Sequence, residues 1–227
     1  MTTFALVHGA WHDGSCWELV APLLEQRGHR VVAPDLPISD LDATYEDYAQ
    51  VVLDALGEDE EPFVLVGHSL GSDTIPLVAV RRTPERLVYL CPRLGGFTDR
   101  PAGEPRAFLA PQKLPRDNEE GLAAWAPDDA VQVLYSGVDP ALAQTMAARL
   151  RPQAAVFRRP YPLAEPPPGI PATLIHGADD EFFDPAWSRW VARELLGVAP
   201  MEIRGGHFPM LERPEELAEL LCAAPSA

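Results

Sequence analysis

Short apolar runs alternate along the chain with segments in which apolar side chains recur every three to four residues. The first pattern is typical of buried strands in a parallel sheet, and the second is typical of helices that pack one face against such a sheet. Strands are expected at residues 4–7, 30–33, 63–66, 86–91, 172–176 and 201–203. Helices are expected at residues 16–27, 44–57, 70–82, 185–196 and 213–222.

This alternation predicts an α/β fold. Strands and helices at this spacing form right-handed βαβ units, in which the strands pair in parallel. We therefore expect a mostly parallel sheet of about six strands with helices on both faces. Thr44 begins one of the helices, and Asp47 three positions later predicts a capping box with an aspartate in place of the usual Glu or Gln.

The alternation breaks off after Pro92. Proline-rich stretches and amphipathic segments follow, without a strong strand pattern, as far as residue 160. We expect residues 93–160 to form a small helical cap over the carboxyl edge of the sheet, and residues 1–92 and 161–227 to form the α/β core. Within the cap, helices are expected at residues 119–125, 128–135 and 140–150.

The most informative motif is Gly67-His68-Ser69-Leu70-Gly71, which lies between an expected strand and an expected helix. Gly-x-Ser-x-Gly in that position predicts a tight, strained turn that places a serine hydroxyl at the carboxyl edge of the sheet. Gly67 and Gly71 are needed because the strand end and the first helical turn approach closely there. Ser69 is therefore the candidate nucleophile.

A serine nucleophile needs a base, and six histidines compete for that role. In an open parallel sheet, groups that act together follow the carboxyl ends of strands. His207 follows the last expected strand in a glycine-containing loop, so it is the predicted base, by analogy with the chain order serine, acid, histidine. The others are better suited to packing, loop support, the surface or the pocket wall: His8, His12, His29, His68 and His176.

The acid that orients the base is expected in the turn after the strand at residues 172–176. Asp179 and Asp180 both lie in this turn, and the alternative position after the strand at residues 86–91 offers no carboxylate. Either aspartate satisfies the spacing.

An oxyanion hole needs two backbone N–H groups aimed at one point. Leu70, directly after the nucleophile, supplies one, and the loop after the first strand supplies the other, from Ala10 or, as second choice, Trp11.

Composition excludes several classes of function. The net charge is −16, so no basic excess exists to bind a nucleic-acid backbone or an anionic membrane surface. The chain has no apolar run long enough to cross a membrane, and Met1 to Phe4 lack the pattern of a signal peptide, so we expect a cytoplasmic protein. Three cysteines without metal-site spacing are expected to be buried free thiols. No metal or cofactor is expected.

The chain resembles the α/β-hydrolases and, within them, the small serine hydrolases grouped with plant methylesterases and hydroxynitrile lyases. The resemblance covers about residues 3–92 and 170–222. In that family the position of the acid corresponds to Asp180, so the resemblance assigns the triad Ser69, His207 and Asp180. Four segments carry it: Leu6-Val7-His8-Gly9-Ala10-Trp11-His12, Gly67-His68-Ser69-Leu70-Gly71, Gly177-Ala178-Asp179-Asp180 and Gly206-His207-Phe208-Pro209-Met210-Leu211.

Two activities of that family can be separated by residue type. The lyases have a threonine where this chain has Gly9, and a lysine where it has Phe208. Both residues support cyanohydrin chemistry, so the resemblance implies an esterase rather than a lyase. The expected substrate is a small carboxylic ester. A lactone or thioester hydrolase remains an alternative, and a hydroxynitrile-lyase-like enzyme or a non-catalytic binding protein on the same scaffold is less favoured.

Substrate contacts are expected from Trp11 and from Trp125 in the cap. Something must shield the carboxyl edge of the sheet from water if an apolar substrate is to bind there. The oligomeric state, monomer or homodimer, stays open. Besides Trp125, the cap side chains expected to wall the pocket are Phe108, Leu109, Leu122, Val131, Leu134 and Met146.

Overall fold

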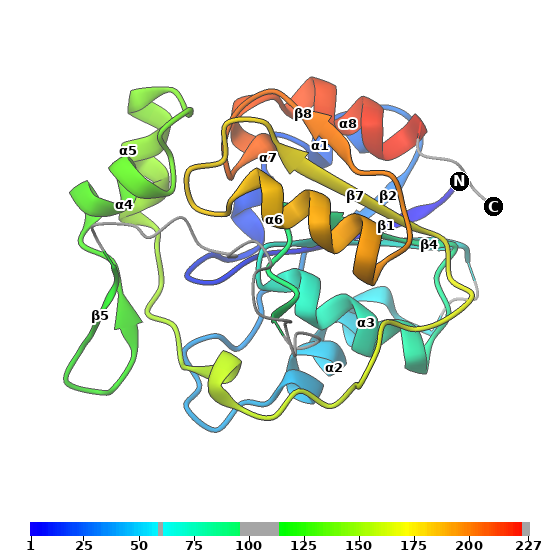
Figure 1. Cartoon of the computed structure of the whole chain (residues 1–227), viewed down its shortest axis with the longest axis horizontal. Coiled ribbons are helices and arrows are strands. Elements are labelled where there is room, and N and C mark those ends of the chain that lie inside the picture. The colour runs from blue at the N-terminus through cyan, green and yellow to red at the C-terminus, as the bar shows by residue number, and fades with distance from the viewer. Residues whose placement is uncertain (59–60, 96–113, 224–227) are drawn as a thin grey trace.

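One parallel sheet organises the computed structural model, which describes residues 1–58, 61–95 and 114–223. Six strands lie in the order β2-β1-β3-β4-β7-β8, with helices on both faces (Figure 1). The expected mostly parallel sheet is therefore confirmed. The strands are β1 (Thr3–Val7), β2 (Arg30–Val32), β3 (Phe63–His68), β4 (Arg86–Leu90), β7 (Ala172–Gly177) and β8 (Met201–Ile203).

The register of the central strands decides where the loops meet. Val7 at the end of β1 pairs with Gly67 in β3, and His68 at the end of β3 pairs with Leu90 at the end of β4. Because parallel strands share one carboxyl edge, the loops after β1, β3 and β4 leave the sheet side by side. Every residue of these three strands is buried.

Helices cover the two faces of the sheet in pairs. On one face α2 (Tyr45–Leu56) packs against α3 (Gly71–Arg81), and on the other α1 (Ala21–Glu25) packs against α8 (Pro214–Ala223) (Figure 1). The capping box that begins α2 is confirmed, since the Thr44 and Asp47 side chains each accept a hydrogen bond from the other residue's backbone N–H. No described helix is long and apolar enough to span a bilayer.

Two expected helices differ in detail, and one further helix was not expected. The helix expected at residues 16–27 is instead a 3₁₀ turn, η1 (Gly14–Trp17), followed by the short helix α1. Pro22 explains the break, because it has no N–H to donate to the preceding turn and favours the first turn of a new helix. The helix after β7 is α6 (Pro185–Trp190), continued by the π-helical segment η4 (Val191–Leu195). An unexpected turn of helix, α7 (Pro209–Glu212), precedes α8.

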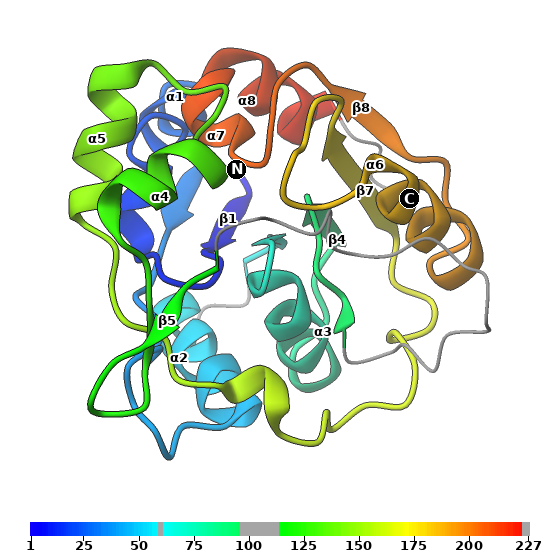
Figure 2. The ribbon, with the colours of Figure 1, turned by 60° about the vertical axis from the view of Figure 1, so that its left-hand side comes forward.

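The described part of the expected cap contains both helices and a hairpin. The helices α4 (Pro127–Val133) and α5 (Pro140–Ala148) match two expected elements, and η3 (Val156–Arg158) is a further 3₁₀ turn. The helix expected at residues 119–125 was wrong, because β5 (Arg116–Asp117) and β6 (Ala123–Ala124) form an antiparallel hairpin there (Figure 2). The Asn118 side chain accepts hydrogen bonds from the amides of Glu120 and Leu122, which stabilises a turn in place of a helix.

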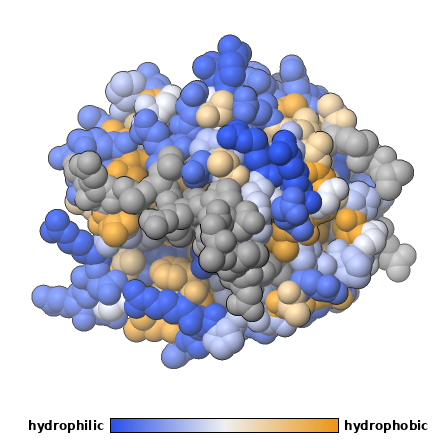
Figure 3. Space-filling view, viewed as in Figure 1, coloured by the Kyte–Doolittle hydropathy of each residue, from blue (hydrophilic) through white to orange (hydrophobic). Residues whose placement is uncertain are grey.

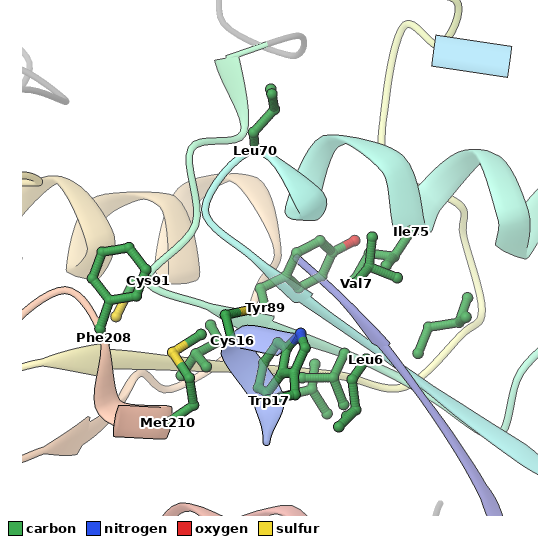
Figure 4. Packing of buried hydrophobic residues seen from close by; sticks show 14 of the residues in the cluster. Leu6, Val7, Cys16, Trp17, Leu70, Ile75, Tyr89, Cys91, Phe208 and Met210 are labelled. Carbon is green, nitrogen blue, oxygen red and sulfur yellow. The ribbon is translucent and has the colours of Figure 1, made fainter. Parts of the chain in front are cut away.

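The core fills both faces of the sheet. In Figure 4, Trp17, Cys16 and Met210 pack together in this core, and Ile75 lies near Tyr89. Burying an aromatic side chain of this kind contributes about 1.5–3 kcal/mol. Hydrophilic side chains predominate on the face of the molecule shown in Figure 3.

The three cysteines were expected to be buried free thiols. Cys16 and Cys91 are buried, as expected, whereas Cys222 is exposed near the end of α8, so the expectation was wrong for Cys222.

Candidate active site

Ser69 occupies the strained turn that the sequence predicts between β3 and α3. Its φ angle is +51°, in the left-handed region that non-glycine residues rarely adopt. A Cβ atom added to Gly67 would lie 2.7 Å from the carbonyl oxygen of Gly71, and one added to Gly71 would lie 2.5 Å from that of Val7. Only glycine therefore fits at either position, and the close approach holds Ser69 at the carboxyl edge of the sheet.

The structure brings His207 and Asp180 together. The Nδ1 atom of His207 lies 2.8 Å from Oδ2 of Asp180, and both side chains are buried. The other carboxylate oxygen, Oδ1, accepts hydrogen bonds of 2.8 Å from the amides of Phe182 and Phe183. These contacts fix the carboxylate in one orientation. Asp179, the alternative acid, is exposed in the same turn.

Two side chains hold the backbone on either side of the His207 ring. The Nε2–H group of His68 donates a 2.8 Å hydrogen bond to the carbonyl oxygen of His207. Burial lowers the pKa of His68 well below its ordinary value, and the neighbouring His207 lowers it further, so the ring is neutral. Glu212 accepts hydrogen bonds from the amide of Gly206, at 2.9 and 3.1 Å. Sequence reasoning assigned neither residue a role in the site.

A cavity of about 170 Å³ adjoins Ser69. Two of its walls, Phe182 and Phe183, also contact His207, with ring centroids 5.0 Å from the imidazole in each case. The cavity therefore borders the candidate nucleophile, and two of its wall residues contact the imidazole of His207. Its described lining residues are Ala10, Trp11, Ser69, Leu70, Arg93, Phe157, Phe182 and Phe183.

The amides expected to form an oxyanion hole belong to residues that line this cavity. Within residues 1–58, 61–95 and 114–223, neither the Ala10 nor the Leu70 amide donates a hydrogen bond. Leu70 directly precedes α3, so its N–H lies at the positive end of the helix dipole. The Trp11 amide, by contrast, is directed at Oε1 of Gln153, 3.4 Å away. This contact favours Ala10 over Trp11 as the second donor.

The two tryptophans expected to contact substrate differ in position. Trp11 lines the cavity, whereas Trp125 packs edge-on against Trp11, with ring centroids 5.6 Å apart. Of the other side chains expected as walls, Leu122, Leu134 and Met146 are buried in packing, and Val131 is partly buried against the core. Phe108 and Leu109 lie outside the described residues.

His12, expected as a candidate for the pocket wall, instead ties the loop after β1 to the segment after α4. Its Nδ1–H group donates a 2.7 Å hydrogen bond to the carbonyl oxygen of Ala10. Its Nε2 atom accepts a 2.5 Å hydrogen bond from the hydroxyl of Tyr135. Burial lowers the pKa of His12 to about 4, which keeps this bridge in its neutral form near pH 7.

Comparison with known proteins identifies the family of this chain. The model of the Alpha/beta hydrolase family matches residues 4–220. The chain belongs to that family. A pyrethroid hydrolase from Sphingobium wenxiniae is 30% identical over 97% of this chain and 86% of its own length. The crystal structure of a pyrethroid hydrolase from Sphingobium faniae JZ-2 superposes with a TM-score of 0.80 at 29% identity, covering 97% of this chain and 96% of the other.

The resemblance to plant methylesterases is also confirmed. Methylesterase 2 from Arabidopsis thaliana is 39% identical over 94 residues, which are 37% of this chain and 35% of that protein. Salicylic acid-binding protein 2 from Nicotiana tabacum is 28% identical over 96% of this chain and 95% of its own length, so the likeness to the plant proteins extends along most of the chain.

Sequence reasoning assigned no site role to four lining residues of this alpha/beta hydrolase: Arg93, Phe157, Phe182 and Phe183. Phe157 lies in the turn η3, and no local pattern marks it as part of the site. Arg93 follows β4 by three positions, and its guanidinium pairs with the buried carboxylate of Asp73. Its place after a strand end is visible in the sequence, but an arginine there is not a group that a serine triad requires.

Backbone strain in this alpha/beta hydrolase is concentrated around the cavity. Among the described residues, the non-glycine positions with positive φ are Trp11 (+62°), Ser69 (+51°), Cys91 (+43°) and Leu94 (+42°). All four lie in the loops after β1, β3 and β4. Such strain costs about 1–3 kcal/mol per residue and persists where surrounding contacts over-determine it, which is typical of functional sites.

One group of side chains has the chemistry of metal ligands. Ligand atoms of Cys91, Asp180 and His207 lie within 4.8 Å of one another. Burial raises the pKa of the Cys91 thiol well above its ordinary value, and the nearby Asp180 raises it further, so forming a thiolate ligand there is costly. The hydrogen bond between His207 and Asp180 would also have to break. The absence of a metal stays a prediction.

Proposed function

We propose that this protein is a serine hydrolase that cleaves small carboxylic esters through Ser69, His207 and Asp180. The observation that carries the proposal is the 2.8 Å contact between His207 Nδ1 and Asp180, beside a cavity lined by a serine on a strained turn. A buried aspartate at that distance orients the ring and stabilises the imidazolium that forms during proton transfer.

In the first half of the reaction Ser69 Oγ attacks the carbonyl carbon of the ester. The hydroxyl proton passes to Nε2 of His207, and the carbonyl oxygen becomes an oxyanion that the amides of Ala10 and Leu70 stabilise. The bond between the carbonyl carbon and the alkoxy oxygen then breaks. His207 returns the proton to the departing alcohol, and the acyl group stays on Ser69.

In the second half a water molecule attacks the acyl-enzyme. His207 takes a proton from the water, and the same two amides stabilise the second oxyanion. The ester bond to Ser69 breaks, Ser69 recovers its proton from His207, and the carboxylic acid leaves. Apart from the ester and this water molecule, every group that takes part in the two halves belongs to the chain.

The cavity wall favours small, uncharged ester groups. Four aromatic side chains, Trp11, Phe157, Phe182 and Phe183, surround the approach to Ser69. The names of the relatives, which include a pyrethroid hydrolase and a methylesterase, support an ester over other acyl compounds. We infer further that residues 93–160 act as a cap that contributes to substrate choice, since Phe157 and Arg93 come from this segment.

A lyase of the hydroxynitrile type is disfavoured by the space at Gly9. A Cβ atom there would lie 2.9 Å from Cβ of Ser69 and 3.0 Å from Nδ1 of His68. The threonine expected of such a lyase therefore has no room on this backbone. Hydrolysis of lactones or thioesters would use the same groups and remains a matter for substrate screening.

The test is turnover of p-nitrophenyl esters of graded acyl length, with γ- and δ-lactones and an acyl thioester alongside. The wild-type chain is expected to hydrolyse short esters, and Ser69→Ala is expected to lose activity by several powers of ten with its fold unchanged. The circular dichroism spectrum and the melting temperature of both proteins provide the control. Equal turnover by the two proteins would overturn the proposal.

A further inference from the structure

Arg93 is the one charged side chain among the described residues that line the cavity, and ester hydrolysis itself gives it no role. It belongs to the loop after β4, next to the strained turn that carries Ser69. Its backbone N–H donates a 3.2 Å hydrogen bond to the carbonyl oxygen of Ser69. The position of this arginine is thus tied to that of the candidate nucleophile.

The guanidinium group is held from several sides. Its Nη1 atom pairs with the carboxylate of Asp73 and donates a 3.2 Å hydrogen bond to the hydroxyl of Tyr45. Its Cζ atom lies 5.6 Å from the centre of the Phe157 ring, in a cation–π contact with another residue of the cavity wall. Side chains from α2, α3 and η3 therefore converge on one arginine.

The backbone around Arg93 is shaped to allow this placement. Cys91 and Leu94 both adopt positive φ angles, +43° and +42°. A Cβ atom on Gly95 would lie 2.7 Å from Cζ of Arg93, so a side chain at this position would require the guanidinium to shift. Strained residues before and after Arg93 in the chain indicate that the position of its side chain is maintained at a cost to stability.

Arg93 retains donors for a ligand. A guanidinium carries five N–H groups, and the described contacts are made through Nη1. In the part of the chain that the structure describes, Nη2 and Nε donate no hydrogen bond to protein. The side chain is 19% exposed while it lines the cavity, so an oxygen atom of a bound molecule can reach it.

The charge of Asp73 determines which kind of oxygen is favoured. The carboxylate of Asp73 is fully buried and balances the positive charge of Arg93. An anionic ligand on Arg93 would bring a second negative charge next to the buried carboxylate of Asp73, which a low-dielectric site disfavours. An uncharged acceptor, such as an ether or carbonyl oxygen, takes a hydrogen bond from the guanidinium without that cost.

We propose that Arg93 is a specificity-determining residue that hydrogen-bonds a second, uncharged oxygen atom in the acyl or alkoxy part of the ester. The favoured substrates are thus neutral esters with an ether or carbonyl oxygen near the scissile bond. This inference rests on the proposed esterase function and adds a substrate class to it.

The test compares esters that differ only by exchange of a methylene group for an ether oxygen. On the acyl side, the pairs are p-nitrophenyl methoxyacetate with butyrate, 3-methoxypropanoate with pentanoate, and 4-methoxybutanoate with hexanoate. On the alkoxy side, 2-methoxyethyl acetate is paired with butyl acetate. The ratio of kcat/KM within each pair is measured, since a ratio from one preparation does not depend on the folded fraction.

The principal variant is Arg93→Met combined with Asp73→Asn, which removes both charges together. Arg93→Lys is the second variant, because it keeps the charge that balances Asp73 but lacks the forked guanidinium. Arg149→Met is the matched control, because Arg149 also pairs with a carboxylate, that of Glu18, but at the surface.

For at least one pair, the ether-to-methylene ratio is expected to fall 10- to 100-fold in both Arg93 variants, the range for a hydrogen bond from a charged donor. Arg149→Met should leave the ratio unchanged. Wild type is expected to use p-nitrophenyl hydrogen succinate poorly relative to the pentanoate, and Asp73→Asn should improve that ratio at least tenfold.

Ratios that stay within twofold of wild type for every pair in both Arg93 variants would overturn the inference while leaving the esterase function intact. A wild-type preference for the succinate would also overturn it, because it would show that the arginine selects anions. A wild-type protein that hydrolyses none of these esters would instead overturn the proposed function.

Discussion

Replacing Asp180 by Asn tests the candidate triad at the point where the structure is most specific. In the wild type, Oδ2 of Asp180 accepts a hydrogen bond from Nδ1–H of His207, and Oδ1 accepts two from the amides of Phe182 and Phe183. An asparagine can keep its oxygen towards the two amides only by turning its NH₂ group towards His207. That group donates, so Nδ1 of His207 would have to accept.

The change reverses the tautomer of the imidazole. If Nδ1 accepts, the proton lies on Nε2, and His207 can no longer take the proton of Ser69. The expected loss in kcat is about 10⁴-fold, the loss known for this exchange of tautomer in a serine protease triad. At 1.36 kcal/mol per factor of ten, this corresponds to about 5.4 kcal/mol of transition-state stabilisation.

The assay is kcat and KM for the best p-nitrophenyl ester, with Asp179→Asn as the matched control. Asp179 is the neighbouring exposed aspartate, and its substitution removes the same charge from the same turn. Asp179→Asn should keep at least a third of the wild-type kcat. If Asp180→Asn lost less than tenfold while Asp179→Asn lost more, the assignment of the acid would be refuted.

Three further predictions concern groups that support the site. Gly71→Ala should destabilise the fold by at least about 2 kcal/mol in urea unfolding, because its Cβ would lie 2.5 Å from a backbone oxygen of β1; an unchanged midpoint would contradict this. Glu212→Met should lower kcat more than it raises KM, because methionine cannot replace the carboxylate that accepts the hydrogen bond from the amide of Gly206, the residue before His207; an equal loss of kcat in the surface control Glu216→Met would contradict this.

His12 has a pKa of about 4 in the folded protein against 6.5 unfolded, so only the unfolded state gains its proton between these values. Stability should therefore fall by about 3 kcal/mol from pH 6.5 to 4 through this group alone, and His12→Phe should remove that part of the slope in urea unfolding at several pH values.

The sheet and the strained turn at Ser69 could be predicted from the sequence because their signals are local. Apolar runs mark β1, β3 and β4, and Gly-x-Ser-x-Gly fixes the turn that joins β3 to α3. The choice between Asp179 and Asp180 was not decided by spacing, and only the resemblance to a family singled out Asp180. The structure supplies the physical difference, which is that Asp180 is buried against two amides and His207.

What escaped prediction depends on contacts between distant parts of the chain. Arg93 becomes part of the cavity wall because Asp73 and Tyr45, on two different helices, hold its guanidinium. The hairpin at residues 116–124 replaces an expected helix because Asn118 captures two amides and because Ala123 pairs with Gln153 far along the chain. Periodicity over a short window contains neither kind of information.

The contacts that orient His207 have a consequence for how such a protein can evolve. Asp180 is held by the amides of Phe182 and Phe183, and the backbone of His207 is held by His68, all without the hydroxyl of Ser69. Loss of that hydroxyl therefore leaves the cavity and its polar groups in place. A substitution at Ser69 is therefore expected to abolish turnover while leaving a cavity that can still bind the ester, so catalysis and simple binding on this scaffold differ by one oxygen atom.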